Sequence, residues 1–436
     1  MDDLYHGVTA AKLGRYAVIL FAISVFSGVF KYWMRHYVIG ISRHIEFDLR
    51  NDVFAHLQRL PLQYFQRTRT GEIMSRATND LAAVRMMLGP GVMYLVNTGT
   101  VAVVAVGFML AISPRLTAYS LLPLPLVSLM VWLFGDRIHR RFEQIQAHFA
   151  EISARVQENL AGVRVVRAFA REEREIEDFR ALNREYLHKN LALIRASGLF
   201  HPVLGFLSGL AALLGLYLGG REVMSGHITL GQFVAFTVYL AMLNWPVFAL
   251  GWVINLFQRG TASFQRIVEI LEVAPEIRSP ARALRPARCR GEMEFRGLTF
   301  TYPGADRPAL RDVSITVPAG TFVAVVGRTG SGKTTLLSLV PRVFDPPAGT
   351  VLIDGVDVRR LDLAWLRSRI ACAPQETFLF AATVAENIAY GVERADQAGI
   401  ERVARVARLD GDVRGFPLGY ETPVGERGIT LSGGQK

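Results

Sequence analysis

Cysteine is scarce in this chain: its 436 residues contain two, Cys289 and Cys372, far apart in the sequence. Two separated cysteines supply neither a disulfide framework nor the paired spacing of a zinc or redox site. The first residues, Met1-Asp2-Asp3, also lack the basic segment that precedes the apolar stretch of a cleavable signal peptide. We therefore expect neither a disulfide-rich secreted fold nor a cleaved leader.

The chain also lacks the mixture of aromatic and basic residues that would make a surface for reading nucleic acid. Its formal net charge is +11, but the arginines fall between apolar stretches, and 51% of the residues are hydrophobic. Basic loops between apolar segments are typical of a membrane protein whose positive loops remain in the cytoplasm. We expect a lipid membrane, and no nucleic acid, as the partner of the basic residues.

Long apolar runs dominate the first part of the chain. A transmembrane helix needs about 20 mostly apolar residues, and five runs reach that length. They lie near 16–39, 91–113, 116–135, 196–220 and 229–257.

Proline occurs inside three of these runs, where neighbouring helices can satisfy the freed backbone groups. We expect kinks at these positions, which fit either plain packing or a functional hinge. The prolines are Pro123, Pro125, Pro202 and Pro246.

Arginine separates the loops into two classes. Segments 41–90 and 136–195 are long and arginine-rich, whereas 113–116 and 219–226 are short and nearly neutral. The long basic loops are therefore expected in the cytoplasm, together with everything after the last span. Five spans would then place Met1 outside, so we expect one further helix upstream of this sequence.

Both long loops have helical patterns. From Ile145 to Val163 apolar residues recur every three or four positions on an otherwise polar segment. Membrane helices that continue into the cytosol and pack together would give this pattern. Short segments at the loop tips could also dock onto a nucleotide domain, and 71–76 and 162–169 are the candidate tips.

Substrate identity does not follow from the spans. Lys31 stands out as a charge inside a span, although a lysine can extend toward the interface. Aromatic side chains suit an apolar drug or lipid, and they suit helix packing equally well. These aromatic residues are Phe21, Phe26, Trp132, Phe206, Phe233, Phe236, Tyr239, Trp245 and Phe248.

The residue pattern changes after the last span. Residues 272–291 lose the apolar periodicity and contain three prolines among arginines, which indicates a linker between a membrane domain over 1–271 and a second domain over 292–436. The second domain has the pattern of a mixed α/β fold. Strands are expected at 292–300, 314–317, 321–326 and 350–353, with a turn at Asp354-Gly355 and helices at 333–341 and 361–368.

A phosphate-binding loop lies between the expected strand at 321–326 and the helix at 333–341. Residues 327–334 match the pattern G-x-x-x-x-G-K-[ST] completely. The loop's glycines let backbone N–H groups surround a phosphate, and a helix start adds positive potential. Lys333 is expected on the β- and γ-phosphates, and Thr334 on Mg²⁺. The expected ATP-binding residues here are Gly327, Arg328, Thr329, Gly330, Ser331, Gly332, Lys333, Thr334 and Thr335.

The string Leu-Ser-Gly-Gly-Gln at 431–435, in one domain with the phosphate loop and behind membrane helices, resembles the signature of ABC transporters. The chain is most similar to bacterial multidrug and lipid exporter half-subunits that fuse permease and ATPase. The resemblance implies a helical transmembrane domain of the exporter type followed by an α/β P-loop nucleotide-binding domain.

The resemblance also implies roles for residues outside the loop. Tyr302, in Phe-Thr-Tyr-Pro, would stack on adenine, although a lone tyrosine there would otherwise be a packed strand end. Gln375 would contact the metal or the attacking water. Residues 378–380 and 383–388 resemble the segment that receives a coupling helix, and the stretches near 71–80 and 158–170 resemble the coupling regions.

In this family two nucleotide domains enclose two ATP molecules, so the resemblance implies a homodimer or heterodimer with a second half-subunit. The signature of one subunit would donate hydrogen bonds to the ATP that is bound by the other subunit. Pro423 stands where many exporters have an acidic residue, which puts one contact between domains in question. The signature residues are Ser432, Gly433, Gly434 and Gln435.

The family continues after its signature with the Walker B strand, whose acidic residues help hold Mg²⁺ and activate water. No such segment follows in these 436 residues. We therefore expect a sequence cut at both ends, and weak ATP hydrolysis by the chain as written.

Three functions remain in view. The first is an exporter subunit of the inner (plasma) membrane, with a cytoplasmic ATPase that drives efflux of drugs, lipids or other apolar compounds. The second is a non-hydrolytic ATP-binding membrane protein without transport activity. A membrane-anchored P-loop kinase or GTPase is the third, and the string at 431–435 argues against it.

Overall fold

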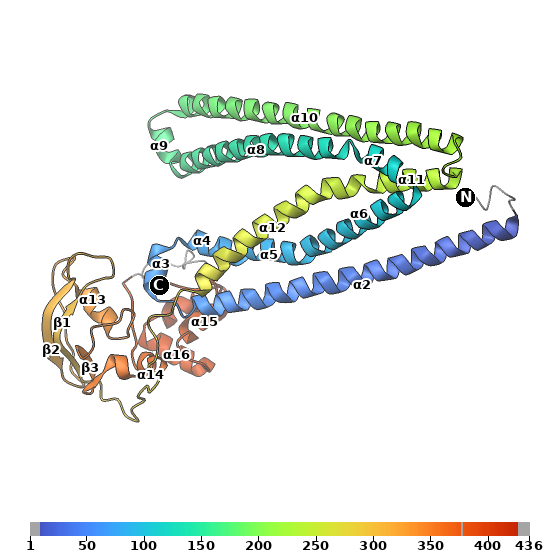
Figure 1. The fold of residues 1–436 in the computed structure, drawn as a ribbon. Helices are drawn as coiled ribbons and strands as arrows, with labels where there is room; N and C mark the ends of the chain where they lie inside the picture. Colours follow the sequence, from blue (N-terminus) through green and yellow to red (C-terminus); the bar gives the residue numbers. More distant parts are fainter. Residues whose placement is uncertain (1–8, 376–377, 426–436) are drawn as a thin grey trace. The chain divides into compact units, whose positions relative to one another are not determined.

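The computed structural model describes residues 9–375 and 378–425, apart from some side chains within its helices. The chain divides into two compact units, Met1–Ala274 and Pro275–Lys436. Figure 1 shows long helices in the first unit and a small sheet with short helices in the second. The signature residues Ser432, Gly433, Gly434 and Gln435 lie outside the described residues.

The first unit is built from helices, and two π-helical turns (η1 and η2) interrupt the second long stretch, Thr70–Ile112. The elements are α2 (Ala10–Leu57), α3 (Leu62–Arg67), α4 (Thr70–Ser75), η1 (Arg76–Asp80), α5 (Leu81–Met86), η2 (Met87–Gly91), α6 (Val92–Ile112), α7 (Pro114–Leu121), α8 (Leu124–Ala161), α9 (Val163–Ala168), α10 (Glu172–Met224), α11 (Leu230–Met242) and α12 (Asn244–Leu271).

Three stretches of the described chain are long and apolar enough to cross a membrane, namely Ala10–Leu57, Thr70–Ile112 and Glu172–Met224. They contain the expected spans near 16–39, 91–113 and 196–220. The expected spans near 116–135 and 229–257 are each divided between two helices, α7 with α8 and α11 with α12.

Proline explains one of these divisions and part of the other. Helix α7 ends at Leu121, and Pro123 precedes the first residue of α8, because proline cannot continue the hydrogen-bond ladder of α7. Pro246 lies in the first turn of α12, where its missing N–H costs nothing. Pro202 is different, since α10 continues through it.

The end of the first long loop, 41–90, is held to α12 by buried contacts. Ile73 from α4 and Ile267 from α12 belong to one apolar cluster that also contains Val53 of α2. Beside it the Asp80 carboxylate accepts hydrogen bonds from Ser263 Oγ at 2.8 Å and from Arg266 Nε at 2.9 Å. These contacts join the π-turn η1 to the last helix of the unit.

The second long loop, 136–195, is formed by parts of α8 and α10, which run side by side and are joined by α9 (Figure 1). The buried His148 ring on α8 contacts the Leu182 carbonyl of α10 at 3.0 Å. Further along, Arg155 pairs with Glu175 at 2.7 Å. At the tip, Phe169 is 73% exposed and therefore has little packing within this unit.

The second unit contains one antiparallel sheet in the order β2-β1-β3-β4. Its described strands are β1 (Met293–Phe300), β2 (Leu310–Val317), β3 (Val351–Ile353) and β4 (Val356–Asp357). Three of the four expected strands are thereby confirmed. The helices and 3-10 turns are α13 (Lys333–Leu339), η3 (Val358–Arg360), α14 (Leu363–Ser368), α15 (Val384–Ala389), α16 (Gln397–Val406), α17 (Asp410–Arg414) and η4 (Gly419–Glu421).

A two-residue turn joins β3 to β4. Asp354 and Gly355 have φ values of 48° and 77°, and Ile353 pairs with Val356 across the turn. Positive φ at both central positions favours the Asp-Gly pair and matches the twist of the strands. The Asp354 carboxylate also accepts the Arg290 N–H at 2.7 Å, which attaches the preceding chain.

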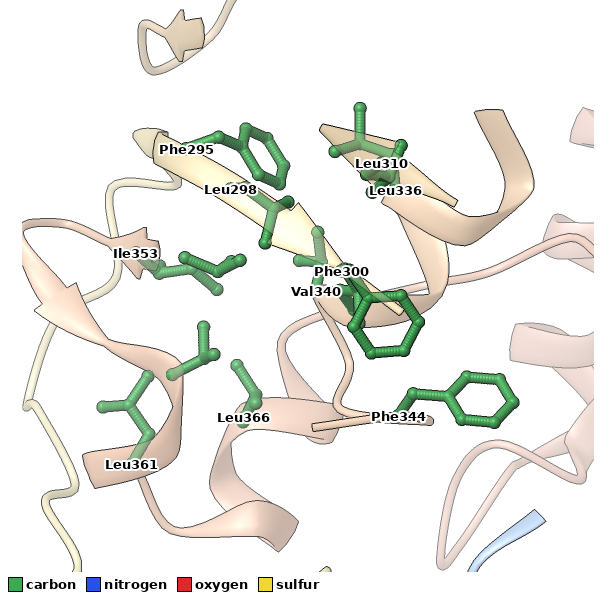
Figure 2. Packing of buried hydrophobic residues seen from close by; sticks show 13 residues of the cluster. Phe295, Leu298, Phe300, Leu310, Leu336, Val340, Phe344, Ile353, Leu361 and Leu366 are labelled. Atoms are coloured by element: carbon green, nitrogen blue, oxygen red, sulfur yellow. The ribbon is translucent and has the colours of Figure 1, made fainter. Parts of the chain in front are cut away.

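The core of the second unit lies between β1, α13 and α14. Figure 2 shows Phe295, Leu298 and Phe300 of β1 directed toward side chains of the helices and of β3. Leu298 and Leu366 are completely buried there. This cluster fixes β1 in the middle of the sheet and places α13 against it.

The predicted strand at 321–326 is wrong for this structure. The segment has no strand pairing among the described residues, and Phe322 and Val326 are 95% and 89% exposed. A strand is stable only when neighbours accept its hydrogen bonds and cover its side chains. The described part of the chain provides no such neighbour here.

The predicted linker is ordered along part of its length. Leu284 forms an isolated parallel bridge with Leu361, and its N–H donates to the Arg360 carbonyl at 2.9 Å. Ser279 and Arg285 each donate to the Asp362 carboxylate at 3.2 Å. Residues 275–291 therefore belong to the second unit.

Candidate nucleotide-binding site

The phosphate loop, residues 327–334, passes from the exposed segment 321–326 into α13. Two of its glycines, Gly330 and Gly332, have φ values of 84° and 86°, which other residues rarely adopt. A Cβ on Gly332 would lie 2.7 Å from Leu310 Cδ2 and 2.8 Å from the Ala309 carbonyl oxygen. The loop is therefore pressed against the start of β2 at Gly332.

Lys333 supplies a positive charge at the end of the loop next to α13. Its Nζ donates to the carbonyl oxygens of Gly327 at 2.7 Å and Arg328 at 2.8 Å, and lies 3.4 Å from Ser331 Oγ. These contacts fold the ammonium group across the loop. Among the described residues no carboxylate pairs with it, so its charge is available to an anion held by the loop.

Thr334 and Thr335 follow the lysine on different sides of α13. Thr334 is exposed, whereas Thr335 is buried and its Oγ1 lies 2.8 Å from the Tyr302 hydroxyl. The exposed hydroxyl of Thr334 is free to bind a metal ion beside the loop. The buried hydroxyl of Thr335 instead connects α13 to the end of β1.

Tyr302 packs as part of the core. Its ring makes edge contacts with Phe300 and Phe344, with centroids 5.1 Å apart in both pairs. Tyr302 therefore packs at the end of a strand, which is the alternative interpretation of a lone tyrosine at this position. The structure brings Tyr302 next to the phosphate loop through Thr335, a contact that sequence spacing did not indicate. Its stacking on adenine stays a prediction.

Gln375 lies at the end of an exposed stretch without regular secondary structure. Among the described residues its side chain makes no hydrogen bond with the phosphate loop. The structure thus brings together Tyr302, Thr335 and Lys333 with the loop glycines, and it leaves the role of Gln375 untested. No cluster of three or more His, Cys, Asp or Glu residues that could hold a metal ion occurs in the described chain.

The segment at 378–390 presents aromatic rings to solvent. Phe380 stacks on Tyr390 with centroids 4.4 Å apart, and Asn387 both accepts from and donates to the Phe380 backbone. A capping box between Thr383 and Glu386 starts α15. The sequence pattern T-x-x-E was the signal that could have located this helix start.

Pro423 is part of a short pairing beside α15. It bridges Thr383 in antiparallel fashion, and Val424 N–H donates to the Ala382 carbonyl at 2.8 Å. A proline fits there because the hydrogen bonds come from the residues on either side of it. The unusual residue is therefore accommodated by the local fold.

Comparison with protein families gives two matches that follow one another along the chain. Residues 1–247 match the family described as "ABC transporter transmembrane region", and residues 310–436 match the family described as "ABC transporter". The first match alone covers more than half of the chain.

Similar proteins come from several bacteria. The "Multidrug resistance-like ATP-binding protein MdlA" of Escherichia coli (strain K12) is 39% identical over 421 residues, which are 96% of this chain and 70% of that protein. The "Probable multidrug resistance ABC transporter ATP-binding/permease protein YheI" of Bacillus subtilis (strain 168) is 36% identical over 442 residues, which cover 100% and 75%. An "ATP-dependent lipid A-core flippase" of Syntrophus aciditrophicus (strain SB) is 32% identical over 436 residues, covering 100% and 72%.

A solved structure is also similar. It is described as a bacterial Atm1-family ABC exporter with ATP bound, and it aligns with a TM-score of 0.76 at 27% sequence identity. The alignment covers 100% of this chain and 77% of that one. The likeness extends over both compact units.

Proposed function

Because this chain belongs to the ABC transporter family, with a transmembrane region and an ATPase domain in one polypeptide, we propose that it binds ATP at residues 327–335 and uses it to export amphiphilic or apolar compounds. The exporter relatives support efflux as the direction of transport. Drugs and lipids are the substrate classes that those relatives suggest.

The geometry of the phosphate loop carries this proposal. Gly332 leaves no room for a side chain, Lys333 crosses the loop, and Thr334 is exposed at the start of α13. Such a cradle suits the β- and γ-phosphates of ATP, with Lys333 as the neutralising cation. In the proposed roles Thr334 and Gln375 hold Mg²⁺, Gln375 also positions water, and Tyr302 contacts adenine.

The proposed active unit is a dimer of half-subunits. Ser432, Gly433, Gly434 and Gln435 of one subunit would donate hydrogen bonds to the ATP on the other subunit's phosphate loop. The tips at 71–76 and 162–169 are proposed to contact nucleotide-binding domains. Phe169 and Val165 support this for the second tip, because they have little apolar packing in their own unit. The proposed domain organisation is a transmembrane domain over 1–271, a linker over 272–291 and a nucleotide-binding domain over 292–436.

The second candidate function, ATP binding without hydrolysis, is favoured by one observation. Among the described residues no carboxylate contacts Lys333 or Thr334, whereas hydrolysis needs acidic groups at the metal and the water. We propose that residues 1–436 bind ATP and that the water-activating carboxylate is not among them. Phosphate release by this chain, measured beside a longer form that includes a Walker B segment, separates the two functions: equal rates would contradict the proposal.

Photolabelling with azido-ATP tests nucleotide binding. The purified full chain should be labelled, and Lys333→Ala should reduce labelling at least about tenfold, because the loop loses its only lysine. Lys189→Ala is the matched control, since Lys189 pairs with Glu185 on α10 in the other unit. Equal labelling of wild type and Lys333→Ala would show that the loop is not the site.

Cysteine accessibility tests the cytoplasmic placement of both long loops. Cys289 and Cys372 are exposed and must first be replaced by serine. Single cysteines at Gln66 and Arg171 should then react with an impermeant maleimide in inverted vesicles but not in intact spheroplasts. Reaction of either site from outside would contradict the proposed topology.

A further inference from the structure

The two π-turns of the first unit have different causes. The second, η2, contains Pro90, whose nitrogen carries no hydrogen for the α-helical ladder. The first, η1, contains neither proline nor glycine, and neither type occurs anywhere between Glu72 and Leu88. Such a segment would ordinarily continue as an α-helix. Because π-turns are rare and often occur at functional positions, the cause of η1 must be sought outside its own sequence.

Close packing fixes η2 in one form. A Cβ on Gly89 would lie 2.5 Å from Ser42 Oγ on α2, so the two backbones approach each other without room for a side chain. On the other side, a Cβ on Gly260 of α12 would overlap the Cβ and Sδ atoms of Met87. Proline and these contacts together leave η2 no alternative arrangement.

Charges from α12 hold η1 instead. Figure 1 shows α12 passing beside α5, and η1 packs against the same helix. At one end of the turn, the Asp80 carboxylate accepts from Ser263 and Arg266, and Arg266 Nη2 also donates to Ser263 Oγ at 3.0 Å. At the other end, Arg76 Nη1 donates to the Arg266 carbonyl and to Glu269 Oε2, each at 3.3 Å. Both ends of η1 are therefore tied to α12 by polar contacts.

These contacts can open more easily than those at η2. The Asp80 side chain is 10% exposed, but its partner Arg266 is 43% exposed, so water reaches the guanidinium. The Arg76 Nε atom is buried without a hydrogen-bond partner among the described residues. A small displacement of α12 would separate the Asp80–Arg266 pair without opening a close-packed apolar contact at this point.

An α-helical form of η1 would rotate the tip of the loop. A π-turn closes its hydrogen bonds over one residue more than an α-helical turn. If residues 76–80 became α-helical, α4 would therefore rotate by about 100° relative to α5. Helix α5 would stay in place, because Leu81 and Val84 are each only 1% exposed. On α4, the buried Ile73 would leave its cluster and the 61% exposed Met74 would face a new direction.

We propose that η1 is a two-state joint: the contacts of Asp80 with Ser263 and Arg266 hold the π-turn, and their release makes residues 76–80 α-helical and rotates α4. The joint makes the angle of α4 depend on the position of α12. The rotation stands on the geometry of the first unit. That it alters the contact of the tip with a nucleotide-binding domain rests on the proposed function.

A distance measurement between two spin labels tests the joint. The full chain, with serine at Cys289 and Cys372, carries labelled cysteines in place of Met74 on α4 and of the exposed Phe47 on α2. It is measured in nanodiscs without ATP. Asp80→Ala should shift the most probable distance by several ångströms, because a label about 5.5 Å from the helix axis moves by about 8 Å when the helix rotates by about 100°.

A second variant and a matched control accompany this measurement. Arg266→Gln removes the other member of the pair and should give the same shifted distance. Arg155→Gln removes an ion pair of similar exposure, with Glu175, between α8 and α10. It should leave the distance between the two labels unchanged.

Deletion of one residue separates rotation from simple loosening. Thr78 is an exposed residue of η1, and its deletion removes the extra residue of the π-turn. A regular α-helix then keeps α4 in its present orientation. The deletion combined with Asp80→Ala should therefore restore the wild-type distance, whereas a frayed tip would give a broad distribution that the deletion does not correct.

Three results would overturn the joint. They are an unchanged distance in both Asp80→Ala and Arg266→Gln, an equal shift in Arg155→Gln, and a shifted or broadened distance that the deletion fails to restore. Azido-ATP labelling is measured separately on the same variants. Its failure, together with a shift that the deletion corrects, would remove the proposed function and keep the joint.

Discussion

Two segments of the second unit, β1 and residues 321–326, both have the apolar residues expected of a strand, but their surroundings are opposite. In β1, Leu298 is completely buried. The backbone of β1 is hydrogen-bonded to β2 on one side and to β3 on the other. Residues 321–326 include Phe322, which is 95% exposed, and no strand pairs with them among the described residues. Apolar alternation therefore becomes a strand only where other parts of the chain cover both its edges and its faces.

The phosphate loop lies between 321–326 and α13, and its two halves also differ in how well the surrounding chain supports them. Its second half is supported by β2, through the contact of Gly332 with Leu310, and by the Thr335–Tyr302 hydrogen bond. Its first half follows the exposed segment. The lysine end of the loop is consequently the better-supported end. Three experiments, from the largest expected effect to the smallest, test how well the different segments of this unit are supported.

The largest effect is expected from shortening a side chain at the centre of β1. Leu298→Ala should lower the free energy of unfolding of the second unit by about 2–5 kcal/mol, because a fully buried leucine leaves a cavity. Phe322→Ala removes more atoms but should change it by less than about 0.5 kcal/mol. Hydrogen exchange of peptides from 293–317 in the full chain would measure both. Similar effects of the two variants would remove the contrast between the segments.

The next effect sharpens the contrast within the loop. Gly330→Ala and Gly332→Ala both force alanine to a positive φ, which costs about 1–2 kcal/mol. Gly332→Ala must also displace Leu310 or Ala309, whereas a Cβ on Gly330 meets nothing within 4 Å. We expect an additional cost of about 1–3 kcal/mol for Gly332→Ala, measured by thermal unfolding of the full chain. A larger loss for Gly330→Ala would contradict the support from β2.

The smallest effect concerns Asp362, which holds the chain before β1 by polar contacts instead of burial. The Trp365 N–H lowers the pKa of this carboxylate, burial opposes the shift, and Arg285 and Ser279 lower the pKa further. A lowered folded-state pKa stabilises the fold above the unfolded value of about 3.9, and the contribution disappears as the pH falls through the folded value.

Asp362→Asn keeps a side-chain oxygen for capping α14 but removes the charge opposite Arg285. Its Tm at pH 7 should fall by on the order of 1 °C. The difference from wild type should begin to shrink as the pH falls below about 3.9, and it should disappear as the pH passes through the lowered folded-state pKa. A difference that is independent of pH between 3 and 7 would show that the charge is not responsible.

Local patterns in the sequence predicted much of the fold. The Asp354-Gly355 turn, the strand at 293–300 and the helix after the phosphate loop depend on residues close together in the chain. The strand at 321–326 was wrong because no other described segment pairs with it or covers its side chains, and the sequence of the segment itself does not reveal this. The division of the expected spans near 116–135 and 229–257 followed prolines, although proline alone did not show that Pro202 would leave α10 continuous.

The candidate site was predictable to a similar extent. A contiguous motif identified residues 327–334, because the loop needs those residue types at that spacing. The contact of Tyr302 with Thr335 and the pressure of Leu310 on Gly332 depend on how strands and helix pack, so spacing could not reveal them.

The length of α10 has a mechanical consequence. Its 53 residues form one uninterrupted helix, which at about 1.5 Å per residue extends about 80 Å. A bilayer core takes up about 30 Å of that length, so about 50 Å remains as an arm, braced by α8. A tilt of roughly 5° at the membrane would move the end of this arm by about 4 Å, which is nearly one turn of helix. Small rotations within the membrane would thus be amplified into large displacements at α9.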